Sequence, residues 1–213
     1  MMINTILLYL APVMVAYFLG SIPTAVWVGK RFYNVEVRRD GSGNAGATNT
    51  IRVLGLKAGI PVLVIDVLKG YAAVALAPVI AALFSDEPLS AYLVLASAAA
   101  VVLGHTFPLF AGFKGGKGVA TLLGVGIGLF PAAAGTVVLI FAIILTLTRY
   151  VSLGSVIASI CFPFLVIFVF HSPNVIYSGL AVGVAIFIPI THRKNIVRLL
   201  KGKESKISFR KKS

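Results

Sequence analysis

The stretch that decides the arrangement of this chain is residues 112–149, which read GFKGGKGVATLLGVGIGLFPAAAGTVVLIFAIILTLTR. Its apolar part, residues 118–148, would form a single helix about 46 Å long, whereas the hydrocarbon core of a bilayer is about 30 Å thick. Pro131 divides this run, and Lys114, Lys117 and Arg149 flank it. If all three cations face the cytoplasm, the run must cross the membrane twice. We therefore expect a short span at 118–130 and another at 132–148.

The composition of the whole chain indicates an integral membrane protein. Of its 213 residues, 59% are hydrophobic and 12% are charged, whereas a soluble domain is about half apolar and about a quarter charged. Apolar runs of suitable length predict five further spans, at 5–29, 58–84, 89–110, 151–170 and 175–191. Polar turns are expected at 85–88 and 171–174.

The basic residues fall on one side of this arrangement. Eighteen of the 19 Lys and Arg residues lie on the side of the C-terminus, and the exception, Lys69, lies within a span. Because cytoplasmic loops are enriched in these residues, we predict that the N-terminus is outside and the C-terminus is cytoplasmic. The expected fold is an all-α integral membrane protein with seven transmembrane helices. It forms a single membrane-embedded domain, residues 1–213, with a short basic tail from about residue 196. The net charge of +13 could suggest a nucleic-acid partner. Because the basic residues flank apolar runs, nucleic acid is not expected as a partner.

Four glycines and two lysines form a candidate phosphate-binding loop before the apolar run. Glycine lets backbone N–H groups approach a ligand closely, lysine adds positive charge, and the helix expected after the loop favours an anion at its N-terminus. The loop is not the nucleotide P-loop, because Lys117 is followed by Gly118 rather than by the Ser or Thr that would hold Mg²⁺. An ordinary basic turn between two spans is the alternative. The residues expected to bind phosphate here are Lys114, Gly115, Gly116, Lys117 and Gly118.

The predicted topology brings four polar segments to the cytoplasmic face: residues 41–52, the lysine–glycine loop, residues 149–152 and residues 192–195. Arg52 can form a bidentate pair with phosphate oxygens. Neutral hydrogen bonds can come from Ser42, Asn44, Ser152 and Asn195. These residues and His192 would together form a site for phosphate-bearing ligands at the membrane surface.

Other polar residues have structural explanations. Asp66 and Lys69, three residues apart on one helical face, are expected to form an intramembrane pair. His105 can simply hydrogen-bond at a helix end, and the basic tail can contact anionic lipid. The three histidines lack metal-ligand spacing, and the single cysteine, Cys161, allows no disulfide within the chain and no Cys-based metal site. We therefore expect no metal and no cofactor.

Three blocks of the sequence form a more specific pattern. Residues 41–52 read GSGNAGATNTIR, residues 104–121 read GHTFPLFAGFKGGKGVAT, and residues 192–196 read HRKNI. Together they closely resemble the bacterial acyl-phosphate-dependent glycerol-3-phosphate acyltransferases. The resemblance implies transfer of a fatty acyl group from acyl phosphate to the 1-hydroxyl of sn-glycerol 3-phosphate, giving lysophosphatidic acid and inorganic phosphate. By this resemblance the catalytic residues are Ser42, Arg52, Lys117, His192 and Asn195. The substrate-binding residues are Gly43, Asn44, Thr48, His105, Lys114, Gly115, Gly116, Gly118 and Ser152.

The resemblance also implies acyl phosphate, glycerol 3-phosphate and membrane lipids as partners, and the inner (plasma) membrane of a bacterium as the location. Because acyl phosphate is already activated, proximity and the neutralisation of two phosphates can supply the rate. A substrate phosphate oxygen could take the hydroxyl proton. The alternatives are a transporter of a phosphorylated small molecule and a structural membrane subunit. A transporter needs access from both sides, yet only Asp66 and Lys69 are polar at mid-membrane depth.

Overall fold

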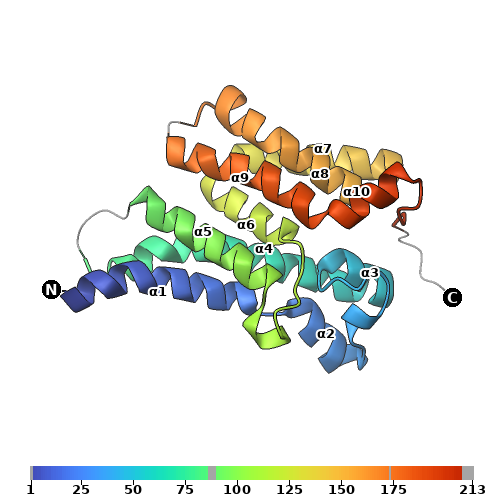
Figure 1. Ribbon diagram of the computed structural model, residues 1–213, viewed down its shortest axis with the longest axis horizontal. Coiled ribbons are helices and arrows are strands. Elements are labelled where there is room, and N and C mark those ends of the chain that lie inside the picture. Colours follow the sequence, from blue (N-terminus) through green and yellow to red (C-terminus); the bar gives the residue numbers. More distant parts are fainter. Residues whose placement is uncertain (1, 86–89, 173, 208–213) are drawn as a thin grey trace. The chain divides into compact units, whose positions relative to one another are not determined.

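The computed structural model describes residues 2–85, 90–172 and 174–207, and the regular secondary structure in these ranges is entirely helical (Figure 1). The predicted turn residues 86–88, Pro173 and the tail residues 210–212 lie outside the described residues. The contacts divide the chain into two compact units, Met1–Leu129 and Phe130–Ser213. The prediction of an all-α protein is confirmed.

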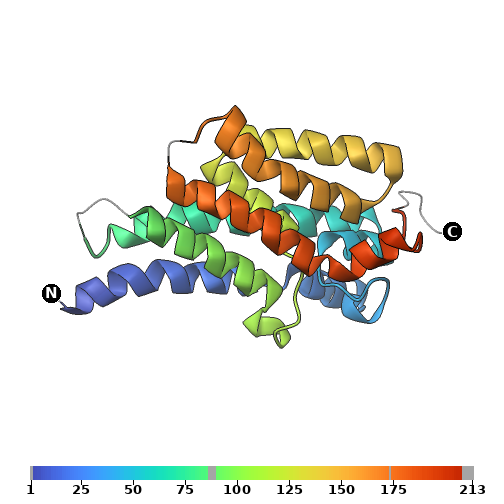
Figure 2. The ribbon, with the colours of Figure 1, turned by 45° about the horizontal axis from the view of Figure 1, so that its top comes forward.

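The first unit is organised around α4 (Leu56–Ala81), which packs against the five other α-helices of this unit. The helix α1 lies along α5 in both views (Figure 1 and Figure 2). The other α-helices are α1 (Met2–Ser21), α2 (Thr24–Tyr33), α3 (Ala47–Leu54), α5 (Ala91–Thr106) and α6 (Val119–Leu129), with short 3₁₀ turns η1 (Val37–Arg39) and η2 (Leu109–Ala111).

The first predicted span, 5–29, is broken into α1 and α2. Pro23 has no backbone N–H and therefore cannot continue the helical hydrogen bonding. The break is stabilised from α4, because Lys69 Nζ donates a hydrogen bond of 3.1 Å to the carbonyl oxygen of Ile22. The apolar segment nevertheless runs from Ile6 to Tyr33 and is long enough to cross a membrane.

The polar segment 41–52, for which no helix was predicted, overlaps the helix α3 (Ala47–Leu54). Gly55 separates α3 from α4 and has a φ of +88°, in the left-handed region that favours glycine. Because an isolated helix of eight residues is marginal in water, the packing of α3 on α4 stabilises this short segment.

The helices α4 and α6 approach each other closely. An ideal Cβ at Gly124 of α6 would overlap the carbonyl oxygen of Val67, and one at Gly70 of α4 would overlap that of Thr121. A Cβ at Gly128 would crowd Val74. Gly124 and Gly128 thus permit the close packing of these two helices.

The second unit consists of α7 (Pro131–Thr148), α8 (Val151–Phe164), a π-helical turn η3 (Leu165–Val169), α9 (Val175–Thr191) and α10 (Arg193–Leu200). Pro131 occupies the first turn of α7, where its missing N–H costs nothing. Asn174 caps α9, since its Oδ1 accepts hydrogen bonds from the N–H groups of Ile176 and Tyr177. The helix α10 lies partly within the predicted basic tail and bends 63° away from α9.

Five helical segments in the described ranges are long and apolar enough to cross a membrane, and the bent pair α9–α10 makes a sixth. The helix α6 is apolar but has only 11 residues. The chain is therefore a multi-pass integral membrane protein.

Candidate functional site

The loop at residues 41–44, in the first unit, is held by Asn49. Asn49 Oδ1 accepts hydrogen bonds from the N–H and the hydroxyl of Ser42, at 2.7 and 3.1 Å. Its Nδ2 donates to the carbonyl oxygens of Val37 and Asp40. Asn49 is buried, whereas Ser42 and Gly43 are exposed and Asn44 is half-buried. The loop is thus exposed at Ser42 and Gly43, while the N–H and the hydroxyl of Ser42 are held by the buried Asn49.

The helix α3 follows this loop and carries Thr48 and Arg52. The aliphatic part of Arg52 lies against Gly41. Its guanidinium makes no hydrogen bond or ion pair with any residue that the structure describes. Arg52 is therefore a cation placed beside the loop and available to an anionic ligand.

The lysine–glycine loop ends where α6 begins, as predicted. Gly118 has a φ of +82° and immediately precedes Val119, the first residue of the helix. Lys114 is exposed and Lys117 is half-buried. The N–H groups of Gly115 and Gly116, however, donate hydrogen bonds of 3.1 Å to the carbonyl oxygens of Thr106 and His105. The expectation that these two N–H groups face a ligand is therefore wrong for this structure. Their bonds instead fold the loop back onto the end of α5.

Arg38 joins this loop to the segment that follows α2. Its Nη1 donates to the carbonyl oxygens of Ala111 and Lys114, at 2.7 and 3.2 Å. Glu36 holds the other side of the guanidinium through two hydrogen bonds of 2.8 Å. Hydrogen bonds from Arg38 and Lys30 lower the pKa of Glu36 to about 2, so this carboxylate is ionised at neutral pH. Within the first unit, one guanidinium thus links the lysine–glycine loop to the segment that leads into residues 41–52.

His105 is buried beneath the lysine–glycine loop, with 6% of its side chain surface exposed. The predicted intramembrane pair is also present in this region, because Lys69 Nζ and Asp66 Oδ1 are 2.8 Å apart and both side chains are buried. That prediction is confirmed.

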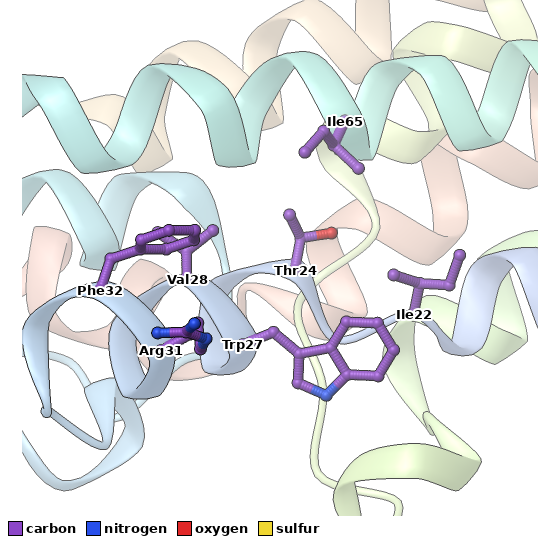
Figure 3. A pocket seen from close by; sticks show the side chains of 7 residues that line it. All are labelled: Ile22, Thr24, Trp27, Val28, Arg31, Phe32 and Ile65. Atoms are coloured by element: carbon purple, nitrogen blue, oxygen red, sulfur yellow. The ribbon is translucent and has the colours of Figure 1, made fainter.

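An apolar pocket of about 310 Å³ lies elsewhere in the first unit, between α2 and α4 (Figure 3). The side chains of Trp27 and Phe32 form much of its wall, and Thr24 and Arg31 are the polar residues among those that line it. None of the predicted site residues lines this pocket. The remaining lining residues are Ile22, Val28 and Ile65.

In the second unit, two of the predicted site residues meet at one carboxylate. Glu204 Oε1 accepts hydrogen bonds from Ser152 Oγ, at 2.9 Å, and from Asn195 Nδ2, at 2.6 Å. Arg198 Nε donates to Glu204 Oε2 at 2.7 Å. Burial raises the pKa of Glu204, but the hydrogen bonds from Asn195, Arg198 and Ser152 outweigh this effect and leave the pKa below its ordinary value. Ser152 and Asn195 thus donate to a carboxylate of the same chain, and that they bind a substrate phosphate stays a prediction.

His192 lies one turn before Asn195, whose N–H donates to the His192 carbonyl oxygen at 2.8 Å. The ring is buried, and Nδ1 is 2.9 Å from the carbonyl oxygen of Ile188. A carbonyl oxygen can only accept, so this contact favours a proton on Nδ1. The orientation of the His192 ring is thereby fixed by the last turn of α9.

Comparison with known proteins identifies the family to which these residues belong. The sequence model of the family described as "Glycerol-3-phosphate acyltransferase" matches residues 10–202. The chain belongs to the glycerol-3-phosphate acyltransferase family. A glycerol-3-phosphate acyltransferase of Chlorobaculum tepidum is 41% identical over 97% of this chain and 100% of its own length. One of Enterococcus faecalis is 45% identical over 92% of this chain and 90% of its own length.

Two solved structures of a glycerol-3-phosphate acyltransferase are also similar. Both are of PlsY (YgiH), described as an integral membrane glycerol 3-phosphate acyltransferase, and both are 38% identical over 94% of this chain and 96% of that chain. The glycerol 3-phosphate form has a TM-score of 0.80 and the lysophosphatidic acid form one of 0.78. The family resemblance inferred from the three sequence blocks is therefore confirmed.

The residues predicted from the glycerol-3-phosphate acyltransferase resemblance fall into two groups. The first unit holds the glycine-rich segments, and the second holds Ser152, His192 and Asn195. In the second unit, Ser152 and Asn195 share the carboxylate of Glu204, and His192 lies one turn from Asn195. That the two groups form one site remains a prediction. The members of the first group are Ser42, Gly43, Asn44, Thr48, Arg52, His105, Lys114, Gly115, Gly116, Lys117 and Gly118.

Sequence reasoning missed two charged residues of this glycerol-3-phosphate acyltransferase that organise the groups. Arg38 is not among the predicted site residues, and Glu204 lies in the basic tail that is expected to contact anionic lipid. Glu204 is the sole carboxylate side chain in the sequence after Glu87, in a strongly basic segment. A single carboxylate in a strongly basic segment indicates that its side chain has a specific partner. The tail up to Glu204 is therefore part of the candidate site rather than only a lipid-binding extension.

Proposed function

We propose that this protein transfers a fatty acyl group from acyl phosphate to the 1-hydroxyl of sn-glycerol 3-phosphate, the first acylation step of phospholipid synthesis. The observation that carries the proposal is the similarity, over nearly the whole chain, to an acyltransferase solved in a glycerol 3-phosphate form and a lysophosphatidic acid form. Acyl phosphate as the donor is supported by the resemblance of the three sequence blocks.

The reaction needs few groups from the protein. The glycerol hydroxyl oxygen attacks the acyl carbonyl carbon, the bond from that carbon to the phosphate oxygen breaks, and the hydroxyl proton ends on the phosphate that leaves. Arg52, Lys114 and Lys117 supply positive charge for the two phosphates. Ser152 and Asn195 supply neutral hydrogen bonds, and His192 orients the acceptor. The rate gain comes from proximity and from charge stabilisation as phosphate departs.

We also propose a seven-span topology with the N-terminus outside, the C-terminus in the cytoplasm and the active site on the cytoplasmic side of a bacterial inner membrane. It is supported by the one-sided placement of Lys and Arg. The helix α6, at about 16 Å, is shorter than the hydrocarbon core and would begin below the membrane surface. The lysine–glycine loop would then line a polar cavity there. The spans are α1–α2, α4, α5, α6, α7, α8 with η3, and α9.

A proteoliposome assay with labelled glycerol 3-phosphate tests the proposed reaction. With palmitoyl phosphate added, the label should appear in lysophosphatidic acid and one equivalent of inorganic phosphate should be released. Palmitoyl-CoA in place of the acyl phosphate should give little product. Vectorial uptake of unchanged label would instead establish the transporter alternative, and neither product nor uptake would favour a structural subunit.

A further inference from the structure

A buried polar cluster lies in the first unit, and the proposed reaction steps use none of its side chains, although the family resemblance places His105 among the substrate-binding residues. Asp66 Oδ1 accepts a hydrogen bond of 3.1 Å from Thr24 Oγ1, lies 2.8 Å from Lys69 Nζ and lies 3.7 Å from His105 Nδ1. Lys69 also donates to the Ile22 carbonyl oxygen. All four side chains are buried, with 2–6% of their surface exposed. Charged groups within a membrane are expensive and are usually functional.

The ion pair by itself has a structural explanation, because Lys69 and Thr24 hold the break between α1 and α2 against α4. His105 is not needed for that purpose. The Asp66–Lys69 pair is complete without it, and an apolar side chain would fill the same space on α5 without the cost of burying a polar ring. The reason for a histidine at position 105 must therefore lie in what the ring contacts on the side away from Asp66.

The other side of the His105 ring lies against the lysine–glycine loop. An ideal Cβ at Gly116 would overlap His105 Nε2, so the ring occupies the space that any side chain at residue 116 would need. The backbone of the same histidine accepts the Gly116 N–H, and Thr106 accepts the Gly115 N–H. His105 thus supports the loop with both its ring and its carbonyl group. Lys117 is the next residue along the chain.

We propose that His105 is a positioning residue for the phosphate-binding loop. Asp66 orients its ring, and the ring supports the backbone at Gly116, so that Lys117 is held in one geometry. Misplacement of a charged group by about 1 Å can cost orders of magnitude in rate. The inference rests on the proposed function only for its catalytic consequence, because the support of the loop by the ring is independent of the reaction.

A double-mutant cycle between His105 and Gly116 tests the contact through activity. Gly116→Ala should lower kcat/KM by at least ~10-fold in the wild-type background, because its methyl group meets the ring. In the His105→Ala background, where the ring is absent, the same change should cost less than ~3-fold. Contacting residues show such non-additivity, whereas distant ones add. His105→Ala alone should raise KM for a phosphate substrate more than it lowers kcat, and His105→Gln should be intermediate. Costs that simply add would overturn the inference.

Amide hydrogen exchange in detergent gives a readout that does not require activity. In His105→Ala, the peptide covering residues 113–118 should exchange at least ~10-fold faster than in the wild type, because opening of the Gly115 and Gly116 hydrogen bonds becomes easier. The matched control is Ser97→Ala, another buried polar residue of α5, which should leave this peptide unchanged. Unchanged exchange in His105→Ala would overturn the positioning role. If exchange increases but the wild-type protein acylates no glycerol 3-phosphate, the proposed function fails and the positioning role stands.

Discussion

Among the individual residues, Arg52 offers the clearest test of the candidate site, because its guanidinium has no partner within the described residues. A charged hydrogen bond is worth about 1.5–3 kcal/mol, and each 1.4 kcal/mol is about tenfold in rate. Arg52→Ala and Lys117→Ala should each lower kcat/KM by at least ~10-fold in the acylation assay. Arg52→Lys should restore only part of the activity, because lysine cannot form a bidentate pair.

The matched control for these charge removals is Lys201→Ala, at an exposed position after α10. It removes the same charge outside the candidate site and should change kcat/KM by less than ~2-fold. A loss in Lys201→Ala as large as that in Arg52→Ala would show that the activity depends on general surface charge, and the assignment of Arg52 would be wrong.

A second residue-scale prediction concerns the ionisation of Glu204. Because its pKa is held below the ordinary value of 4.5, its contribution to stability is fully present above pH 4.5 and is lost as the pH falls through the lower pKa of the folded protein. The difference in thermal midpoint between wild type and Glu204→Gln, measured in detergent, should be constant from about pH 7 to about pH 5. It should shrink below pH 4.5.

This comparison isolates Glu204 because Glu36, whose pKa is also low, titrates identically in both proteins and cancels from the difference. If the difference already shrank between about pH 7 and about pH 6, the pKa of Glu204 would be raised. The hydrogen bonds from Ser152, Asn195 and Arg198 would then not determine its ionisation.

At the scale of the helices, α4 and α6 pack closely at Gly70 and Gly124. Gly124→Ala places a methyl group against the Val67 carbonyl oxygen, and backbone cannot move aside as a side chain can. Overpacking of this kind costs about 1–3 kcal/mol, so the thermal midpoint should fall by several degrees. Gly135→Ala on α7 is the matched control, because a Cβ there meets no atom of the described residues within 4 Å. It should leave the midpoint unchanged or slightly raised, since alanine favours helix. Equal midpoints for the two variants would contradict the close approach of α4 and α6.

At the scale of the whole molecule, the proposed topology predicts which loops are accessible from each side. In a Cys161→Ala background, a cysteine at Lys114 should react with a membrane-impermeant maleimide only from the cytoplasmic side, and one at Ser172 only from outside. Inverted and right-side-out vesicles separate the two cases. Labelling of position 114 from outside would exclude the seven-span arrangement.

The sequence by itself determined the class of the protein and most of its helices. In a membrane, the backbone N–H and C=O groups of a long apolar run can be hydrogen-bonded within a helix. The bounds of α7, α8 and α9 therefore follow the predicted spans closely. The position of Pro131, the N-terminus of α6 after Gly118 and the Asp66–Lys69 pair were also predictable. Each depends on residues within a few positions of one another. The family could be named because each of its three blocks is a short, continuous stretch of the sequence.

Only the tertiary structure decided how the polar residues are held. Lys69 reaches Ile22 across 47 residues, Arg38 reaches Lys114 across 76, and Ser152 reaches Glu204 across 52. The inward-facing N–H groups of Gly115 and Gly116 in the lysine–glycine loop likewise depend on acceptors outside the loop. Hydrogen bonds and ion pairs require atoms within about 3 Å, and local periodicity carries no information about which distant residue will supply them.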